Sequence, residues 1–248
     1  MTLETTKNKA WDEEPPVMAW QNVLLMLVAV MVGVFAAIMV LPSWLPTLTT
    51  SLAGESPKVF WHLSRSTAFV AFGLLWLSMI FGLLITSKLA PIWPGGPTAF
   101  ELHQYSALLG LSFALFHALI LIGDHYIGYT LVKVLVPFSS TNYRPLSVGL
   151  GQIGLYLMML VGLSVYVRKW IGKRIWRLIH FLSFGLFVLA LIHGFSSGTD
   201  SSALWAQSLY GFSALSVLGL LAYRIWKTGR PSVAANFPGR KAKLGNSP

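Results

Sequence analysis

Six long stretches of apolar residues restrict this sequence to one kind of fold. They cover residues 23–41, 60–85, 102–122, 148–167, 175–195 and 204–225. A helix of about 20 apolar residues is long enough to span the roughly 30 Å hydrocarbon core of a bilayer. Such a helix also satisfies its own backbone hydrogen bonds, which lipid cannot do. The pattern therefore predicts an all-α membrane protein with six transmembrane helices packed in one bundle.

The composition favours the same class. Of the 248 residues, 55% are hydrophobic and only 10% are charged, which is typical of integral membrane proteins. We expect a cytoplasmic arm at residues 1–18, a transmembrane domain at 19–227 and a basic, disordered cytoplasmic tail at 228–248. The stretches outside the bundle are too short for a separate soluble catalytic domain.

The basic residues predict the orientation of the chain. The formal net charge is +10, and Lys and Arg gather in the linker at 168–177 and in the C-terminal tail. At such positions they contact lipid headgroups, so we expect membrane lipid and not nucleic acid as the partner. Because positively charged segments usually face the cytoplasm, the linker and both termini are expected on the cytoplasmic side, in a bacterial cytoplasmic membrane.

Four histidines inside two of the apolar stretches are the candidate ligands of a metal cofactor. His103 and His117 lie 14 positions apart in the third stretch, and His180 and His193 lie 13 apart in the fifth. Each spacing corresponds to roughly 20 Å along a helix, so each helix carries one imidazole near each membrane face. The arrangement predicts two facing pairs, His103 with His180 inside and His117 with His193 outside, able to bind two flat metal cofactors.

The chemistry of the ligands narrows the cofactor. The chain has no cysteine, which excludes disulfides, thiolate metal sites and covalent haem attachment. A haem would therefore be of the non-covalent b type, and two axial imidazoles would leave its iron no open position, which favours electron transfer. A lone histidine in a membrane helix often only hydrogen-bonds to a neighbour, but four at matched depths favour ligands, because burying ionisable groups is costly.

Two details of the histidines are left open by the sequence. On straight helices His117 lies within about 40° of His103, whereas His193 lies about 140° from His180. Tilt, a break near Gly185 or cofactors away from the bundle axis would each reconcile the difference. Each Nδ1–H also needs an acceptor. The carbonyls four residues earlier are the expected acceptors, namely those of Ala99, Phe113, Trp176 and Leu189.

Several other polar residues have weaker assignments. Arg65 lies about 9 Å past the outer start of the second stretch, where it either pairs with a propionate of the outer haem or extends to the outer headgroups. His62 and His125 lie near the outer surface, and their role is left open.

Residues 149–154 fit the pattern G-x-G-x-x-G, but no strand precedes them, so close helix packing explains these glycines better than a nucleotide site.

Several short segments resemble one known family. They are Arg65-Ser66-Thr67-Ala68, residues 136–138 and 143–146, Trp176-Arg177-Leu178-Ile179-His180, and His193-Gly194 followed by residues 198–200. With the paired histidines, they are similar to the ferric reductase-like transmembrane domain over residues 58–226. That family includes membrane ferric reductases, the NADPH oxidase core and the haem subunit of the methionine sulfoxide reductase system. The resemblance implies two b haems, and electrons that pass from the cytoplasm to the outer side.

The chain departs from larger members of that family, which carry a fused FAD and NAD(P)H domain. We therefore expect a membrane cytochrome b whose electrons come from a separate flavoprotein, with FMN or FAD, or from quinol, and go to an outer acceptor. Whether it is itself an oxidoreductase or only an electron-transfer subunit is left open. One alternative is the haem-bearing membrane subunit of a specific redox enzyme, as in the sulfoxide reductase pair. Another is a transporter or assembly factor without haem.

Overall fold

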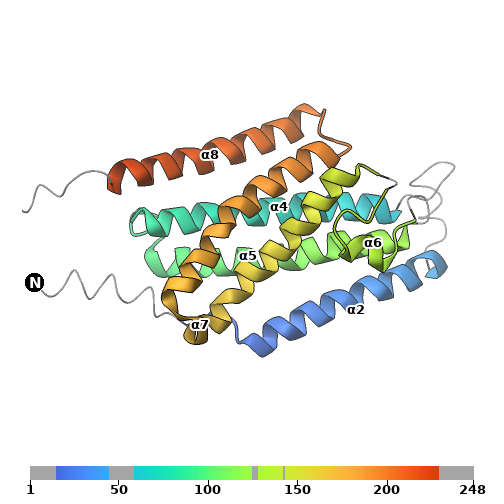
Figure 1. Cartoon of the computed structure of the whole chain (residues 1–248), viewed down its shortest axis with the longest axis horizontal. Helices are drawn as coiled ribbons and strands as arrows, with labels where there is room; N and C mark the ends of the chain where they lie inside the picture. Colours follow the sequence, from blue (N-terminus) through green and yellow to red (C-terminus); the bar gives the residue numbers. More distant parts are fainter. Residues whose placement is uncertain (1–14, 45–58, 125–127, 142, 229–248) are drawn as a thin grey trace, which may run out of the picture.

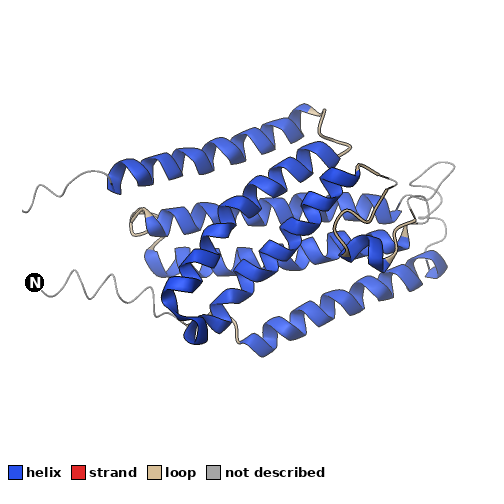
Figure 2. Cartoon of the chain, in the orientation of Figure 1, coloured by secondary structure: helices blue, strands red, loops and turns tan. Residues whose placement is uncertain are grey.

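The computed structural model describes residues 15–44, 59–124, 128–141 and 143–228, and these are almost entirely helical. No strand occurs among them (Figures 1 and 2). The elements are α2 (Trp20–Trp44), α4 (Val59–Thr86), α5 (Gly96–Ile120), the short 3₁₀ helix η1 (Leu121–Gly123), α6 (Leu131–Leu135), α7 (Pro145–Ser197) and α8 (Leu204–Thr228). The prediction of an all-α fold is confirmed. The expected arm and tail lie mostly outside the described residues.

Among the described residues, five helices are long and apolar enough to cross a membrane: α2, α4, α7, α8, and α5 extended through η1 to Gly123. Their outward faces carry exposed Leu, Val and Phe side chains, such as Leu25, Val32 and Leu215. In water such faces would be unfavourable, whereas in a bilayer they match the surrounding lipid. The number differs from the expected six because the expected fourth and fifth helices are the two halves of α7, which meet at Gly172 with no loop between them.

α7 doubles back on itself at Gly172. A straight helix of its 53 residues would be about 80 Å long. Instead its two ends lie together: the hydroxyl of Tyr143 donates to the carbonyl of Ser197 at 2.7 Å. Gly172 has φ 78° and ψ 157°, a conformation that costs glycine little and other residues much. The residues expected to form a loop around 168–174 are therefore helical on both sides of this one turn.

The remaining helices pack around an antiparallel pair. α4 and α5 make the most extensive contact, with α8 against α4 and α2 against α5. Both halves of α7 run obliquely across this pair (Figure 1). A core of apolar side chains fills the middle of the bundle; its buried members include Phe72, Leu75, Met79, Leu111, Met158 and Phe187. The sequence did not indicate α6, a five-residue helix within the connection between α5 and α7.

Candidate cofactor site

The four histidines of α5 and α7 meet as the two pairs expected from the sequence. The ring centres of His103 and His180 lie 5.9 Å apart, with an angle of 72° between the ring planes. Those of His117 and His193 lie 6.1 Å apart, at 68°. Helices α5 and α7 therefore present two opposed imidazole pairs of nearly the same geometry at two levels of the bundle.

The spacing of the rings discriminates between two kinds of contact. A direct N–H···N hydrogen bond of about 2.9 Å between facing rings would place their centres roughly 5.1 Å apart. Two imidazoles bound to one metal at about 2.0–2.1 Å have centres roughly 6.2–6.4 Å apart. The observed 5.9 and 6.1 Å lie nearer the second value. The spacing thus fits two ligands of one metal ion better than it fits a direct hydrogen bond, and it is also the spacing of an edge-to-face contact between two rings.

Backbone carbonyls of α4 and of the first half of α7 orient three of the four rings. The Nδ1 of His103 lies 2.8 Å from the carbonyl oxygen of Ser78, that of His117 lies 2.8 Å from the carbonyl of Ser64, and that of His193 lies 2.8 Å from the carbonyl of Ser147. A carbonyl only accepts, so Nδ1 carries the proton, and the free lone pair belongs to Nε2. Nε2 is the atom that a neutral imidazole offers to a metal.

The acceptors expected from the sequence were therefore wrong for these three histidines. The carbonyls of Ala99, Phe113 and Leu189 were expected, four residues back in each ligand's own helix. In a helix those carbonyls already accept backbone N–H groups, and the histidine side chains here reach across to another segment instead. For His180 no hydrogen bond of the ring is present among the described residues. Its ring stacks on Trp176, with centres 5.2 Å apart and planes at 27°.

Two serines of α4 repeat the spacing of the α5 histidines. Ser64 and Ser78 are both buried and, like His117 and His103, lie 14 positions apart. Each serine hydroxyl donates to the carbonyl of its histidine, at 3.0 Å for Ser64 and 3.2 Å for Ser78. Because the helices are antiparallel, the same contact recurs at both levels. Sequence reasoning missed these serines, although their matched spacing was a usable signal.

The oblique path of α7 explains how His180 and His193 both reach α5, although on a straight helix they point about 140° apart. The backbone of its second half stays helical through Gly185, where a break had been one of the options. Figure 1 shows this half crossing α5 at an angle. A helix that crosses its partner presents different faces to it along its length, so His180 and His193 both reach α5 despite their difference in direction. The crossing of α7 therefore brings both histidines to α5 without a break near Gly185.

Two glycines leave room for the imidazoles. A Cβ atom at Gly151 would lie 2.5 Å from Nδ1 of His193, and one at Gly82 would lie 3.3 Å from the ring of His103. The first distance excludes any side chain unless His193 moves. Gly151 belongs to the G-x-G-x-x-G segment, so close packing does explain it, but the group packed against it is a candidate ligand.

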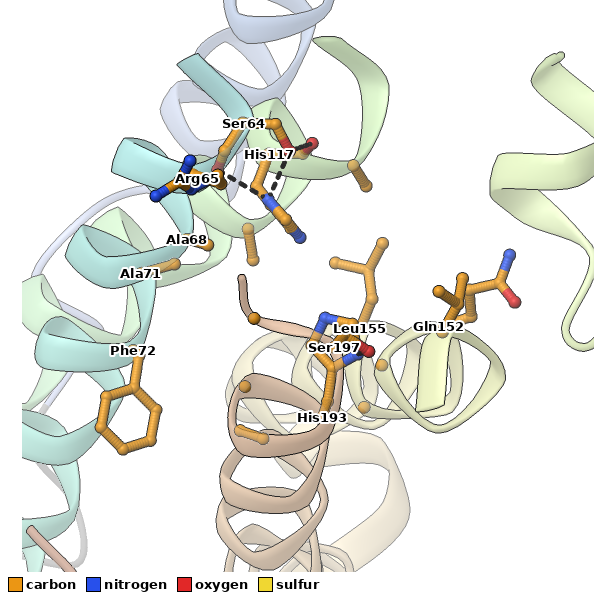
Figure 3. Close-up of a pocket in the computed structure, with 18 of the residues that line it drawn as sticks. Ser64, Arg65, Ala68, Ala71, Phe72, His117, Gln152, Leu155, His193 and Ser197 are labelled. Carbon is orange, nitrogen blue, oxygen red and sulfur yellow. Dashed lines mark hydrogen bonds between the residues drawn. The ribbon is translucent and has the colours of Figure 1, made fainter. Parts of the chain in front are cut away.

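A cavity of about 220 Å³ surrounds the outer pair. One water molecule needs only about 10–15 Å³ of such space. Figure 3 shows His117 and His193 extending toward one another across it from α5 and α7. Its walls are mainly apolar, with Phe72, Leu75, Leu155, Met158 and Leu186 among the lining residues. An apolar cavity with two convergent imidazoles is the kind of site that holds a largely hydrophobic cofactor.

The end of the cavity next to α6 is polar. Arg65, Tyr129, Lys133, Tyr143 and Asp200 all line it. Burial raises the pKa of the Tyr129 phenol above its usual value, and the neighbouring Tyr143 adds to the effect, so Tyr129 stays a neutral hydroxyl. Tyr129 and Lys133 belong to the connection that carries α6, so this connection forms part of the polar wall.

Arg65 forms an ion pair that the sequence did not predict. Its Nε donates to a carboxylate oxygen of Asp200 at 3.1 Å, and one terminal nitrogen binds both carboxylate oxygens. The pair joins α4 to the turn between α7 and α8. Figure 3 shows the Arg65 side chain directed away from the space between the two rings. A role for Arg65 with a haem propionate stays a prediction, since Asp200 already neutralises its charge.

The chain has two further histidines, His62 and His125. His62 is exposed on α4, and His125 lies outside the described residues. Within the described part of the chain, no three His, Cys, Asp or Glu side chains converge as ligands for a metal ion. Two opposed imidazoles instead suit a metal whose remaining positions are filled by a planar macrocycle.

Comparisons of the chain with protein-family models, curated proteins and solved structures found no match.

Proposed function

We propose that this protein is a membrane cytochrome b that carries electrons across the bilayer through two haems, each held by one histidine of α5 and one of α7. One observation supports the proposal: the centres of the two imidazole pairs lie 5.9 and 6.1 Å apart, a spacing that leaves room for one metal ion between the rings of each pair. The likeness to the ferric reductase-like transmembrane family is part of the same proposal.

Each residue of the site has a role in this function. His103 and His180 hold the inner haem, and His117 and His193 hold the outer one. The carbonyls of Ser64, Ser78 and Ser147 keep three rings in the tautomer that exposes Nε2. The apolar core around Phe72 and Phe187 excludes water between the two levels. When bound, a bis-histidine haem supplies one-electron transfer and no open iron position.

The orientation extends the proposal to the whole chain. Both halves of α7 cross the membrane, which makes six crossings with the Gly172 turn and both termini in the cytoplasm. Basic residues surround that turn, among them Lys173 and Arg174, in agreement with the positive-inside rule. Electrons then enter from a cytoplasmic flavoprotein or from quinol and leave to an acceptor on the outer side.

The test is a count of haem in the purified protein. A dithionite-reduced minus oxidised spectrum should show a b-type cytochrome, and haem extraction should give two haems per chain. Electron paramagnetic resonance should show low-spin iron only, because both axial positions are occupied. Protein that is folded, by circular dichroism, but contains no haem after expression with added haem precursor would overturn the proposal and favour a transporter or assembly factor.

A further inference from the structure

One cation at the outer end of the cavity lacks a carboxylate partner. Lys133 lines the cavity that surrounds His117 and His193. Among the described residues, its ammonium group makes one hydrogen bond, to the carbonyl of Gly128 at 3.3 Å. The other cation there, Arg65, is paired with Asp200. Lys133 is thus the positive charge at this site that no described acidic residue neutralises.

The backbone that carries Lys133 is held firmly over the cavity. Gln152 of α7 is buried, and its side-chain nitrogen donates to the carbonyls of Lys133 and Val134, each at 2.8 Å. Its oxygen accepts from the backbone N–H of Phe138 at 3.2 Å. Gln152 follows Gly151, which contacts the ring of His193. One turn of α7 therefore fixes both the outer ligand and the position of α6.

We propose that Lys133 binds a carboxylate on the edge of the group held by His117 and His193. The inference rests on the proposed function, in which that group is haem b, whose edge carries two propionates. An ammonium group with no other counter-charge, on a fixed backbone at the polar end of an apolar cavity, is suited to such a partner. Arg65 then acts mainly as a tie between α4 and the α7–α8 turn.

This arrangement has an electrostatic consequence that can be measured. A positive charge near the haem stabilises the form with one more electron, by the same reasoning that favours an anion beside a cation. Lys133→Met should therefore lower the midpoint potential of the outer haem. We expect the equilibrium constant for its one-electron reduction to fall at least threefold, which corresponds to about 28 mV. The inner haem should keep its potential, and the haem content should stay at two per chain.

Matched variants separate charge from packing. Lys133→Arg should retain most of the outer potential, because the charge stays near the same position. Arg144→Met is the control: Arg144 also carries a positive charge at this end of α7 but does not line the cavity, and its guanidinium donates to the carbonyl of Ser196. Equal shifts in Lys133→Met and Arg144→Met would reduce the effect to general surface charge and overturn the proposal.

A second experiment identifies the carboxylate. The apoprotein is reconstituted with iron protoporphyrin or with its dimethyl ester, in which both propionates are neutral. The effect of Lys133→Met on the outer potential should be present with the first and absent with the second. If it persists with the ester, Lys133 does not bind a propionate. If the potential is unchanged but reduction of ferricyanide slows, Lys133 serves an anionic acceptor instead, and the proposal is wrong.

The experiments can refute the role of Lys133 without refuting the proposed cytochrome. Wild-type protein with two haems per chain and no response to Lys133→Met would leave the proposed cytochrome standing and remove only the role of Lys133. Wild-type protein without haem would remove both.

Discussion

At the scale of residues, the geometry of the His117–His193 pair depends on two hydrogen bonds and on one glycine. The Nδ1 of His117 is held by Ser64 and that of His193 by Ser147, so each ring has one tautomer and one direction. The space for His193 exists only because residue 151 has no Cβ. For His117 the acceptor comes from another helix, α4, whereas for His193 the acceptor Ser147 and Gly151 both lie in the first half of α7. The site therefore depends on side chains and on their close surroundings together.

Replacing one ligand should affect one level only. In His117→Ala the outer pair keeps a single imidazole, so the outer haem should be lost while the inner pair, on other residues, keeps its haem. We expect one haem per chain and roughly half of the reduced-minus-oxidised absorbance. Loss of both haems, or of neither, would contradict two independent sites.

Adding a methyl group at Gly151 should have a similar effect by another route. The Cβ of Gly151→Ala would lie 2.5 Å from Nδ1 of His193, so the ring must move and the outer haem should be weakened or lost. Gly162→Ala is the matched control in the same helix, because a Cβ there meets nothing within 4 Å. That variant should keep both haems and gain up to about 1 kcal/mol in helix stability. Equal haem content in the two variants would show that the close approach is unimportant.

At the scale of elements, long-range polar contacts hold the helices in register around the cavity. Gln152 ties α6 to α7, Tyr143 ties the start of α7 to its end, and Arg65 with Asp200 ties α4 to the α7–α8 turn. These contacts involve residues far apart in sequence. They matter because α7 crosses α5 obliquely and so packs against it over only part of its length.

The contribution of the Arg65–Asp200 pair can be isolated by a double-mutant cycle. Arg65→Leu leaves the carboxylate without its partner, and Asp200→Asn leaves the guanidinium without its own, so each single change should destabilise the fold. The double variant should lose less than the sum of the two, with a coupling energy of about 1–2 kcal/mol. Thermal unfolding in detergent measures it. Additive losses would mean that the pair does not contribute as a unit.

At the scale of the whole molecule, the turn at Gly172 determines the topology. It returns the second half of α7 to the end at which the first half began, so that His193 comes within 2.8 Å of the carbonyl of Ser147. If both halves cross the bilayer, the Gly172 turn and the turn at 198–203 face opposite sides. From the distribution of basic residues, the proposed orientation has the Gly172 turn in the cytoplasm.

Because the chain contains no cysteine, single introduced cysteines report this topology cleanly. Both Lys173 and Ser202 are exposed. In intact cells a membrane-impermeant maleimide should label the Ser202→Cys variant and not the Lys173→Cys variant; both should react after lysis. Labelling of both from the outside would refute a second crossing by α7. The reverse pattern would keep six crossings and invert the orientation.

The sequence by itself determined the helical class, the apolar stretches and the matched depths of the four histidines, because these follow from composition and from the 1.5 Å rise of a helix. It did not determine that His180 and His193 both reach α5, that Ser64 and Ser78 support the rings, or that Arg65 pairs with Asp200. Those facts depend on how obliquely α7 crosses its neighbours and on which backbone groups are brought together. Only tertiary packing decides such contacts, since no local spacing along one helix encodes the angle between two.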